Sequence, residues 1–504
     1  MHTVQLLLKP SKYERYEIDR RFRALAHLHN VCVKHARKCM IRLQHDKRYA
    51  ELKLLYNELL KKENLSKKEK SQKKEFAKQL NDRRIVFGLS KASLERYLKV
   101  CGKQFSKFLS SQQVQVEADR VWRGVEKCLF GDGKELHFKK LMELHTIGGK
   151  SNKNGAQFDR DAMQVNWIGL ALKCYLPKSE ASLSYVWESL KGKIRYCNIK
   201  RLMFSSGWRY YAQIVVSEAA PTRVSTGESV MGIDPGVSTI AGVSEDTCIL
   251  EELAPNAIQY EKEIQTISQS MDRSRRIGNP NKYNEDGTTK RSNHEAWKYS
   301  KNYIRMRHLF KTLHRKKQAY IIGSHRELCN KLLSNARYFP VEKMNFQTLQ
   351  KRARETKRQE KKTEVKQKDG TVKVIQKYKR KKRFGCSINR RAPARFLFEL
   401  KRKVEEAGGV YAEVDTKAFK ASQYNHVTDT YEKIPLSQRE KKIGNRMVQR
   451  DLYSAFLIRN ADLNFQHPDR EKCEYEFEHF ADMQDQLIQK MKESGLSMRQ
   501  CFGF

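Results

Sequence analysis

The sequence predicts a multi-domain protein of class α/β plus α and β, in which a helical region, an antiparallel β region and an α/β region follow one another. Its 504 residues are enough for two to four domains, each with a core of its own. Apolar residues recur at steps of three and four between residues 13 and 140, which indicates helices. From residue 164 they alternate with polar residues, as in strands, and after residue 229 short strands and helices take turns.

The first 140 residues predict one strand and then a bundle of helices. The strand is indicated by TVQLLLKP at residues 3–10. Apolar residues at helical spacing follow in FRALAHLHNVCVKHARKCMIRL, LKLLYNELLKK and SLERYLKVCGKQFSKFL. One more helix is predicted by SSQQVQVEADRVWRGVEKCLFGDGK, which starts with Ser and ends in a Gly-rich stop.

The eleven cysteines form no recognisable zinc or disulfide pattern, because they are single residues without a Cys-x-x-Cys pair. The nearest approach to a ligand set is Cys32, His35 and Cys39, which share one face of a predicted helix. Leu25 and Leu28 continue that face. The sequence therefore favours a buried helix stripe over a metal site at these residues.

The middle of the chain predicts a linker and then an antiparallel sheet. The linker is residues 146–160, TIGGKSNKNGAQFDR, which are polar and contain glycine. Alternating apolar and polar residues with many aromatic side chains follow in QVNWIGLALKCYL, KIRYCNIKRLMFSSG and WRYYAQIVVSE. We expect antiparallel strands joined by tight turns.

The second half predicts strands that alternate with basic helices. Two strands around a Pro-Gly turn are indicated by MGIDPGVSTIAGVSED at residues 231–246. The loop IGNPNKYNEDGTTKRSN lies between two basic helical segments, YEKEIQTISQSMDRSRR and YIRMRHLFKTLHRKKQAYIIGSHRELCNKLL. A strand is predicted for RYFPVEKM, and an exposed hairpin for the alternating runs around KDGT.

The C-terminal part predicts a helix, a strand and two further helices. The first helix is PARFLFELKRKVEEAGG, which begins at Pro393 and stops at Gly408 and Gly409, and the strand is VYAEVD. An amphipathic helix with Asp451 at its N-terminal edge is predicted for QRDLYSAFLIRN. One more helix and a frayed end complete the chain.

Three acids, Asp234, Glu342 and Asp451, each stand at the end of a predicted element, where the functional crevice of an α/β sheet lies. Each also has an ordinary explanation, as a turn residue, a surface acid and a helix N-terminal residue. Gathered in one crevice, three carboxylates would repel and resist ionising unless a cation shared the site. Carboxylate oxygens suit Mg²⁺ or Mn²⁺, and two such ions about 4 Å apart serve phosphodiester cleavage. The small Gly236 behind Asp234 would let the strand turn sharply.

The flanks of these acids carry a family resemblance. We find a stretch that resembles the first RuvC motif in GIDPGVSTIAGVSED, the second in FPVEKMNFQTLQKRA and the third in VQRDLYSAFLIRN, in the order of the transposon-encoded TnpB nucleases. Further segments similar to TnpB are MDRSRRIGNPNKYNEDG, RAPARFLFELKRKVEEAGG and VDTKAFKASQYNH. The resemblance covers the second half of the chain, and the first half matches only in layout. Three motifs in order are specific, whereas GIDPG alone is weak.

The resemblance implies an RNA-guided DNA endonuclease, related to the type V CRISPR effectors and to eukaryotic Fanzor proteins. It implies an RNase H-like RuvC nuclease domain, a wedge β-barrel and a helical recognition lobe. Matched motif by motif, Asp234, Glu342 and Asp451 take the catalytic positions and bind two Mg²⁺ or Mn²⁺ ions. The implied partners are a guide RNA and target double-stranded DNA, which a single RuvC site cuts beside a short adjacent motif.

The same resemblance implies the domain boundaries. The wedge barrel comprises its first strand, 1–12, and the rest of the barrel, 156–228, with the recognition lobe, 13–155, between them. The RuvC domain with basic helical and hairpin insertions is 229–415, the target-loading loop is 416–448, and the third RuvC motif and C-terminal helix are 449–504.

TnpB proteins usually carry a zinc finger of two Cys pairs in the target-loading loop. Here YNHVTDTYEKIPLSQREKKIGNRMVQR has no cysteine, and His426 alone does not replace four ligands. We expect a zinc-free loop held by hydrogen bonds and nucleic-acid contacts.

The charge of the chain indicates a polyanionic partner. Lys and Arg number 101 against 58 Asp and Glu, a net charge of +43 that is spread over most of the chain. A guide RNA with about 20 base pairs of heteroduplex offers more than enough phosphates to neutralise it. The candidate contacts are Arg273, Arg275, Arg276, Arg315, Lys316 and Lys317, with Trp122, Trp208, Tyr210 and Tyr211 as stacking side chains. A solvated helix face or a core position is the alternative for each.

Other functions remain open at this level. A compact TnpB-derived type V CRISPR effector would have the same chemistry and take its guide from a repeat array. A non-cutting RNA-guided regulator is disfavoured because all three acids are present, and an unguided RuvC nuclease because of the long basic first half. A general RNA-binding protein would not need the acids. With no run of roughly 18 apolar residues and no signal-peptide pattern at its start, we expect a prokaryotic cytoplasmic protein that acts at the nucleoid, without a membrane partner.

Overall fold

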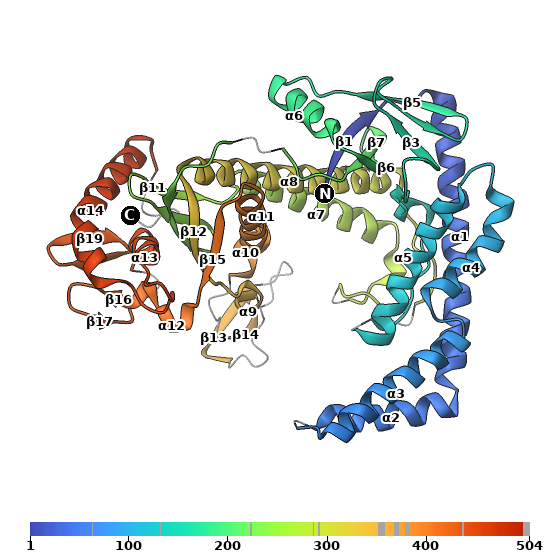
Figure 1. The fold of residues 1–504 in the computed structure, drawn as a ribbon, viewed down its shortest axis with the longest axis horizontal. Coiled ribbons are helices and arrows are strands. Elements are labelled where there is room, and N and C mark those ends of the chain that lie inside the picture. The colour runs from blue at the N-terminus through green and yellow to red at the C-terminus, as the bar shows by residue number, and fades with distance from the viewer. Residues whose placement is uncertain are drawn as a thin grey trace. The chain divides into compact units, whose positions relative to one another are not determined.

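The computed structural model describes residues 1–62, 64–131, 133–221, 224–285, 287–290, 293–350, 358–366, 372–378, 384–435 and 438–496. The chain divides into two compact units, Met1–Pro221 (unit 1) and Thr222–Phe504 (unit 2). Figure 1 shows unit 1 in blue to green and unit 2 in green to red. In the part of the chain so described, no helix is long and apolar enough to cross a membrane.

Unit 1 contains the helices that the apolar spacing predicts and one that it does not, Lys67–Val86, in which Leu80 alone is buried. They are α1 (Lys12–Gln44), α2 (Lys47–Lys61), α3 (Lys67–Val86), α4 (Lys91–Gly102) and α5 (Ser111–Phe130), with short 3₁₀ turns η1 (Lys103–Phe105) and η2 (Leu141–Glu143). A Ser or Asp side chain caps the N-terminus of each α-helix from α1 to α5, which fixes where it begins. Cys32 and Cys39 lie buried in the core with Leu25 and Leu28, so the interpretation as a helix stripe is confirmed.

The sheet of unit 1 has seven strands in the order β2-β6-β7-β1-β5-β4-β3. The strands are β1 (His2–Leu8), β2 (Thr146–Ile147), β3 (Ala156–Asp159), β4 (Gln164–Trp167), β5 (Leu170–Tyr175), β6 (Ile194–Phe204) and β7 (Gly207–Val216). All pair antiparallel, and the opening strand β1 lies between β5 and β7. Ile168 and Gly169 take positive φ angles of 42° and 76°, which makes the tight turn of the β4–β5 hairpin.

One expectation for unit 1 was wrong, and one further helix was not predicted. The expected linker at 146–160 supplies β2 and β3, because strands of two and four residues are too short to show alternation in a polar context. In β3, Ala156 and Phe158 are buried nevertheless. The sequence reading also missed a helix, α6 (Glu180–Lys191), which has only a few buried residues along its length.

The main sheet of unit 2 has six strands that combine both pairing directions. They are β8 (Ser229–Val230), β9 (Gly232–Pro235), β10 (Thr239–Val243), β11 (Cys248–Glu252), β12 (Ala336–Glu342) and β15 (Val410–Val414). The order is β11-β10-β9-β12-β15, with β8 also paired to β12. The first three strands are antiparallel, and β12 is parallel to β9 and β15. The Pro-Gly turn between β9 and β10 is confirmed, since the Gly236 N–H donates to the Thr239 carbonyl at 2.9 Å.

Helices cover both faces of this sheet. One core contains residues of α8 (Lys301–Asn335) and α11 (Pro393–Glu406) with the inner strands, and a second contains residues of α13 (Arg450–Arg459) and α14 (Arg470–Glu493). The sequence predicted α13 as amphipathic, which was wrong, because residues Leu452 to Ile458 are all buried. The helix α14 packs against both α13 and β11, with Phe456 stacked on Phe480 at a centroid distance of 4.5 Å.

The remaining elements of unit 2 lie around this three-layer arrangement. They are α7 (Ala257–Ile277), which packs along α8, and η3 (Pro280–Lys282), α9 (Phe346–Gln350), β13 (Arg358–Lys366), β14 (Val372–Tyr378), α10 (Gly385–Arg391), α12 (Thr416–Phe419), η4 (Ala421–Gln423), β16 (Tyr424–Asn425), β17 (Thr430–Tyr431), β18 (Glu440–Ile443) and β19 (Arg446–Gln449). The predicted hairpin is confirmed by the antiparallel pairing of β13 and β14. Its KDGT turn and the predicted frayed end lie outside the described residues.

Candidate carboxylate site

Asp234 and Glu342 lie side by side at the ends of two parallel strands. The register of β9 and β12 pairs Ile233 with Val341. The next residue on each strand is the acid, so both side chains point to the same face of the sheet. The charge of Glu342 raises the pKa of Asp234, which agrees with this proximity. The strand pairing therefore brings together two acids that are far apart in the sequence.

The pair resists ionisation in the absence of a cation. Burial raises the pKa of Asp234 well above its ordinary range, and the charges of Glu342 and Asp451 raise it further. Burial also raises the pKa of Glu342, with a contribution from the charge of Asp451, and hydrogen bonds with Asp234 and Thr416 offset this only in part. Two such carboxyl groups form a site at which a cation would favour the charged forms of both.

Asp451 lies in the first turn of α13, which packs against β9 and β12. Its Oδ2 atom accepts a hydrogen bond from Arg439 Nη1 at 3.2 Å. Its Oδ1 atom accepts from Arg450, from Nε at 3.2 Å and from Nη2 at 3.0 Å. The side chain of Asp451 is only 14% exposed. Two arginines therefore balance the charge of the third acid in this arrangement.

A glycine allows α13 to approach the strand that carries Asp234. A Cβ atom at Gly232 would overlap the main chain of α13 at the Ala455 carbonyl and at Arg459. Any larger residue would push the helix away from β9, because backbone atoms cannot move aside as a flexible side chain can. The close approach keeps the helix that carries Asp451 against the strand that carries Asp234.

The residues fit a divalent cation by their chemistry. Carboxylate oxygens are the ligands that Mg²⁺ and Mn²⁺ prefer, and a bound cation would lower the raised pKa of the Asp234–Glu342 pair. Within the described ranges, no three His, Cys, Asp or Glu side chains are grouped so that they could hold a metal ion.

The segment before Asp451 is organised by a buried lysine. Lys441 on β18 is 5% exposed, and its Nζ donates to the main-chain carbonyl of Tyr424 at 2.8 Å and to that of Gln423 at 3.3 Å. Burial lowers the pKa of Lys441. His426, also buried, forms a hydrogen bond of 2.8 Å with the Tyr453 hydroxyl. These contacts tie the hairpins β16–β17 and β18–β19 to α13.

The basic residues expected to contact nucleic acid lie on two helices of unit 2. The α7 group is Arg273, Arg275 and Arg276, and the α8 group is Arg315, Lys316 and Lys317. Arg275 and Arg276 pair with Asp272 at 2.6 and 2.7 Å, and Lys317 pairs with Glu261 at 2.7 Å. Arg273 and Lys316 are exposed, so these two are the better placed to meet a phosphate.

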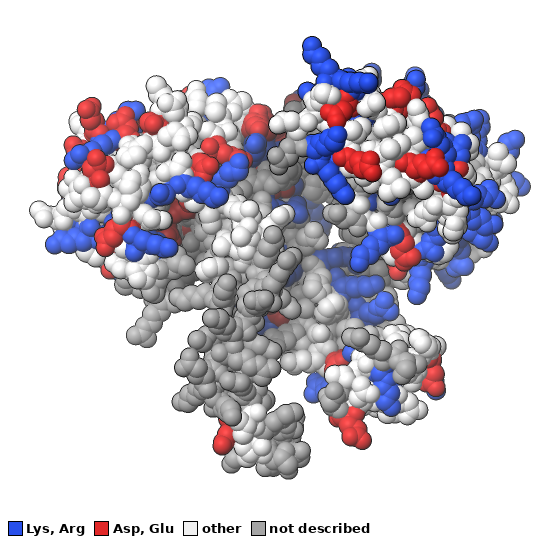
Figure 2. Space-filling view, turned by 90° about the horizontal axis from the view of Figure 1, so that it is seen from below, with Lys and Arg blue, Asp and Glu red and all other residues white. Residues whose placement is uncertain are grey.

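The aromatic candidates lie in unit 1. Trp122 on α5 and Trp208 on β7 are partly buried against the core. Tyr210 is 4% exposed, and Tyr211, partly buried, lies between Leu7 of β1 and Lys200 of β6. On the face of the molecule in Figure 2, Lys and Arg side chains lie on many parts of the surface with Asp and Glu among them. The positive charge is therefore distributed, as the sequence indicated.

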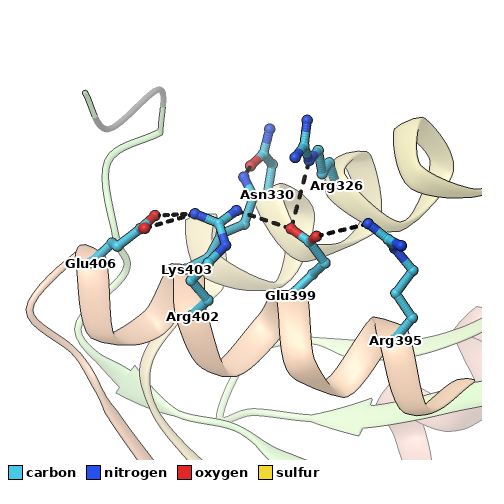
Figure 3. Close-up of polar contacts among 7 residues, drawn as sticks. All are labelled: Arg326, Asn330, Arg395, Glu399, Arg402, Lys403 and Glu406. Carbon is cyan, nitrogen blue, oxygen red and sulfur yellow. Dashed lines mark hydrogen bonds and ion pairs between the residues drawn. The ribbon is translucent and has the colours of Figure 1, made fainter. Parts of the chain in front are cut away.

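A cluster of charged side chains joins α8 to α11 behind the strand that carries Glu342 (Figure 3). Glu399 on α11 has a side chain that is 6% exposed, and it contacts Arg402 at 2.9 Å, Arg395 at 3.5 Å and Arg326 of α8 at 3.6 Å. Arg402 also donates to Glu406 at 2.7 Å. One buried carboxylate thus organises three arginines from two helices that pack on the sheet.

Three residues near the acids were missed from the sequence. Arg450 directly precedes Asp451, and this adjacency was a signal that the sequence offered. Arg439 reaches Asp451 only because the β18–β19 hairpin returns the chain to the start of α13. Lys441 gave no signal, since one lysine among many in a basic chain does not stand out.

Comparison with known proteins gives a distant likeness. No family model and no curated protein matches the sequence. The cryo-EM structure of the Cas12f1-sgRNA-target DNA complex is similar at 12% identity, covering 91% of this chain and 98% of that chain, with a TM-score of 0.44. The cryo-EM structure of a CRISPR-Cas12f ternary complex is similar at 12% identity, covering 91% and 82%, with a TM-score of 0.28. Both TM-scores are low, so this likeness establishes no activity, cofactor or partner for the chain.

Proposed function

We propose that the chain is an RNA-guided DNA endonuclease of TnpB type, with Asp234, Glu342 and Asp451 as its metal-binding catalytic acids. The observation that carries this proposal is the pairing of Asp234 with Glu342 across the parallel strands β9 and β12, with α13 held against both. The strand order β11-β10-β9-β12-β15, with β10 antiparallel, supports an RNase H-like RuvC domain. The net charge of +43 supports a guide RNA and DNA as partners.

In this proposal each part of the chain has a task. Unit 1 supplies the recognition lobe, residues 13–155, and the wedge barrel, residues 1–12 and 156–228, except for residues 222–228, which belong to unit 2. The RuvC domain comprises 229–415 and 449–504, and residues 416–448, cross-linked by Lys441 in place of zinc ligands, form the target-loading segment. Sequence specificity comes from base pairing with the guide, and the basic side chains position the backbones.

The chemistry follows from the acids. When bound, two Mg²⁺ or Mn²⁺ ions supply an activated water and stabilise the leaving oxygen of an in-line phosphodiester displacement. Asp234 and Glu342 hold the site, and their burial against β9 and β12 fixes their positions. Arg439 and Arg450 hold Asp451 in the first turn of α13, and Asp451 would be the third acid to hold the ions.

The proposal is tested by purifying the protein expressed from its complete locus, sequencing the RNA that accompanies it, and assaying cleavage of matched DNA. Asp234→Asn and Glu342→Gln should abolish cleavage and leave RNA and target binding within a few-fold. The control is Asp246→Asn, an exposed acid between β10 and β11, which should cut normally. Cleavage by Asp234→Asn, or a protein that carries only random RNA fragments, would contradict the proposal.

A compact type V CRISPR effector has the same chemistry and is the second candidate. The same three acids and the same excess of Lys and Arg would serve it. The two candidates differ in the origin of the guide. A variable end copied from sequence beside a transposon indicates TnpB, and one from a repeat array indicates a CRISPR effector.

A further inference from the structure

Unit 1 contains a cavity where strand β1 ends and strand β7 begins. Its volume is about 290 Å³. Leu8 of β1 is paired with Tyr210 of β7, and the chain then leaves the sheet through Lys9 and Pro10. The cavity lies just beyond this last pair, where two strands stop covering each other. It is separate from the carboxylate site, which belongs to unit 2.

The floor of the cavity is apolar, and the ring of Trp208 in this floor is held in place. Trp208 and Tyr210 line it together with leucine and proline side chains. The guanidinium carbon of Arg201 lies 4.4 Å from the centroid of the Trp208 ring. Arg201 is 1% exposed, and an ion pair with Asp19 at 2.8 Å and a hydrogen bond to the Leu141 carbonyl at 2.8 Å fix its position. The Trp208 ring is therefore oriented before any ligand arrives.

The rim of the cavity is positively charged. Lys9, Arg15 and Arg209 line it, and no Asp or Glu does. Lys9 lies 4.4 Å from the Tyr175 ring centroid, Arg15 donates to the Pro10 carbonyl at 2.9 Å, and Arg209 lies 4.5 Å from the Phe204 ring centroid. Within the described residues, none of these three cations pairs with a carboxylate, so their charge is available to an anion.

We propose that this cavity binds one unpaired nucleobase, with the phosphates of its strand on Lys9, Arg15 and Arg209. An aromatic floor with a cationic rim fits a ligand that has a flat ring attached to an anionic group. A volume of 290 Å³ is at the lower end of ligand pockets, which suits one base and excludes a duplex. The inference rests on the proposed function, in which a guide RNA supplies the unpaired base. Single-stranded DNA offers the same chemistry.

The test uses fluorescein-labelled single-stranded RNA, single-stranded DNA of the same sequence, and duplex RNA as probes of the full-length protein. Trp208→Ala should weaken binding of single strands about ten-fold, and Trp208→Phe should restore most of it. Binding of the duplex should not change. The control is Trp187→Ala, on α6 and 43% exposed outside the cavity. If Trp208→Ala loses affinity for single-stranded RNA alone, the cavity binds a base of RNA. If it loses affinity equally for single-stranded RNA and DNA, the cavity accepts a base from either.

A second measurement serves if Trp208→Ala does not fold. Lys9→Ala and Arg209→Ala should each lower the slope of log affinity against log salt by about 0.7 for single strands. RNA that carries 4-thiouridine should crosslink to the peptide that contains Trp208. Equal affinity of Trp208→Ala and Trp187→Ala for every probe, or crosslinks only elsewhere, would overturn the nucleobase site in a protein that still binds RNA. A wild-type protein that binds no RNA would overturn the proposed function as well.

Discussion

Replacing Glu399 by glutamine tests how the layer behind the sheet of unit 2 is held together. The side chain of Glu399 is 6% exposed and contacts Arg402 at 2.9 Å, Arg395 at 3.5 Å and Arg326 at 3.6 Å (Figure 3). Glutamine keeps the shape of the side chain and removes its charge. Three guanidinium groups then lose the anion that they share, while the apolar packing of α11 on the sheet is unchanged.

The expected loss follows from these contacts. The contact with Arg402 has the length of a charge-assisted hydrogen bond, which contributes about 1.5–3 kcal/mol. The contacts with Arg395 and Arg326 are longer, and these side chains are 40% and 54% exposed, so water screens each to about 0.2–1 kcal/mol. Arg402 keeps Glu406, which offsets part of the loss. We expect the free energy of unfolding of unit 2 to fall by about 2 kcal/mol.

The loss should depend on pH in one direction. Burial would raise the pKa of Glu399, but the hydrogen bond from Arg402 and the charges of Arg326, Arg402 and Arg395 outweigh it and lower that pKa below its ordinary value. Such a carboxylate stabilises the fold above its unfolded pKa of about 4.3 and loses this effect as the pH falls through the folded pKa. The difference between wild type and variant should therefore be full at neutral pH and disappear in acid.

The assay is urea unfolding of the full chain, with hydrogen exchange of α11 peptides as the local measure. Glu405→Gln is the control on the same helix, because Glu405 is exposed and has no ion pair among the described residues, and it should change stability by less than about 0.5 kcal/mol. If Glu399→Gln is as stable as Glu405→Gln, or if its deficit grows on acidification, the reasoning about this cluster is refuted.

Three further predictions concern the sheet and the target-loading segment. Gly232→Ala should lower the free energy of unfolding by about 3 kcal/mol in thermal unfolding, because the new Cβ would overlap the main chain of α13. The control is Gly323→Ala on α8, where no atom lies within 4 Å of the new Cβ, and it should raise the free energy of unfolding by about 0.5–1 kcal/mol. Zinc analysis of the purified protein should find well under one equivalent, and a stoichiometric amount would show that the loop has ligands we did not recognise. Lys441→Met should speed proteolysis within 416–448, because the carbonyls of Gln423 and Tyr424 lose their hydrogen-bond donor. An unchanged rate of proteolysis would show that Lys441 does not hold this segment together.

Local patterns in the sequence predict the type and order of most elements. Apolar spacing and the Pro and Gly that bound a helix are local properties, and they located the helices α1, α2, α4, α5 and α11. The Pro-Gly turn placed Asp234 at a strand end, and the excess of Lys and Arg predicted a charge spread over the surface. Short strands in polar surroundings, such as β2 and β3, gave too little pattern to be recognised.

Only the tertiary structure decided which residues meet. The parallel pairing of β9 with β12 sets Asp234 beside Glu342, and no local pattern encodes a register between strands separated by two long helices. Packing against α14 and the sheet buries residues Leu452 to Ile458 of α13, although the helix contains polar residues. The arginines on Asp451 and the cavity floored by Trp208 likewise depend on chain segments that return from a distance. Such contacts follow from packing, which is a property of the whole fold and not of a sequence window.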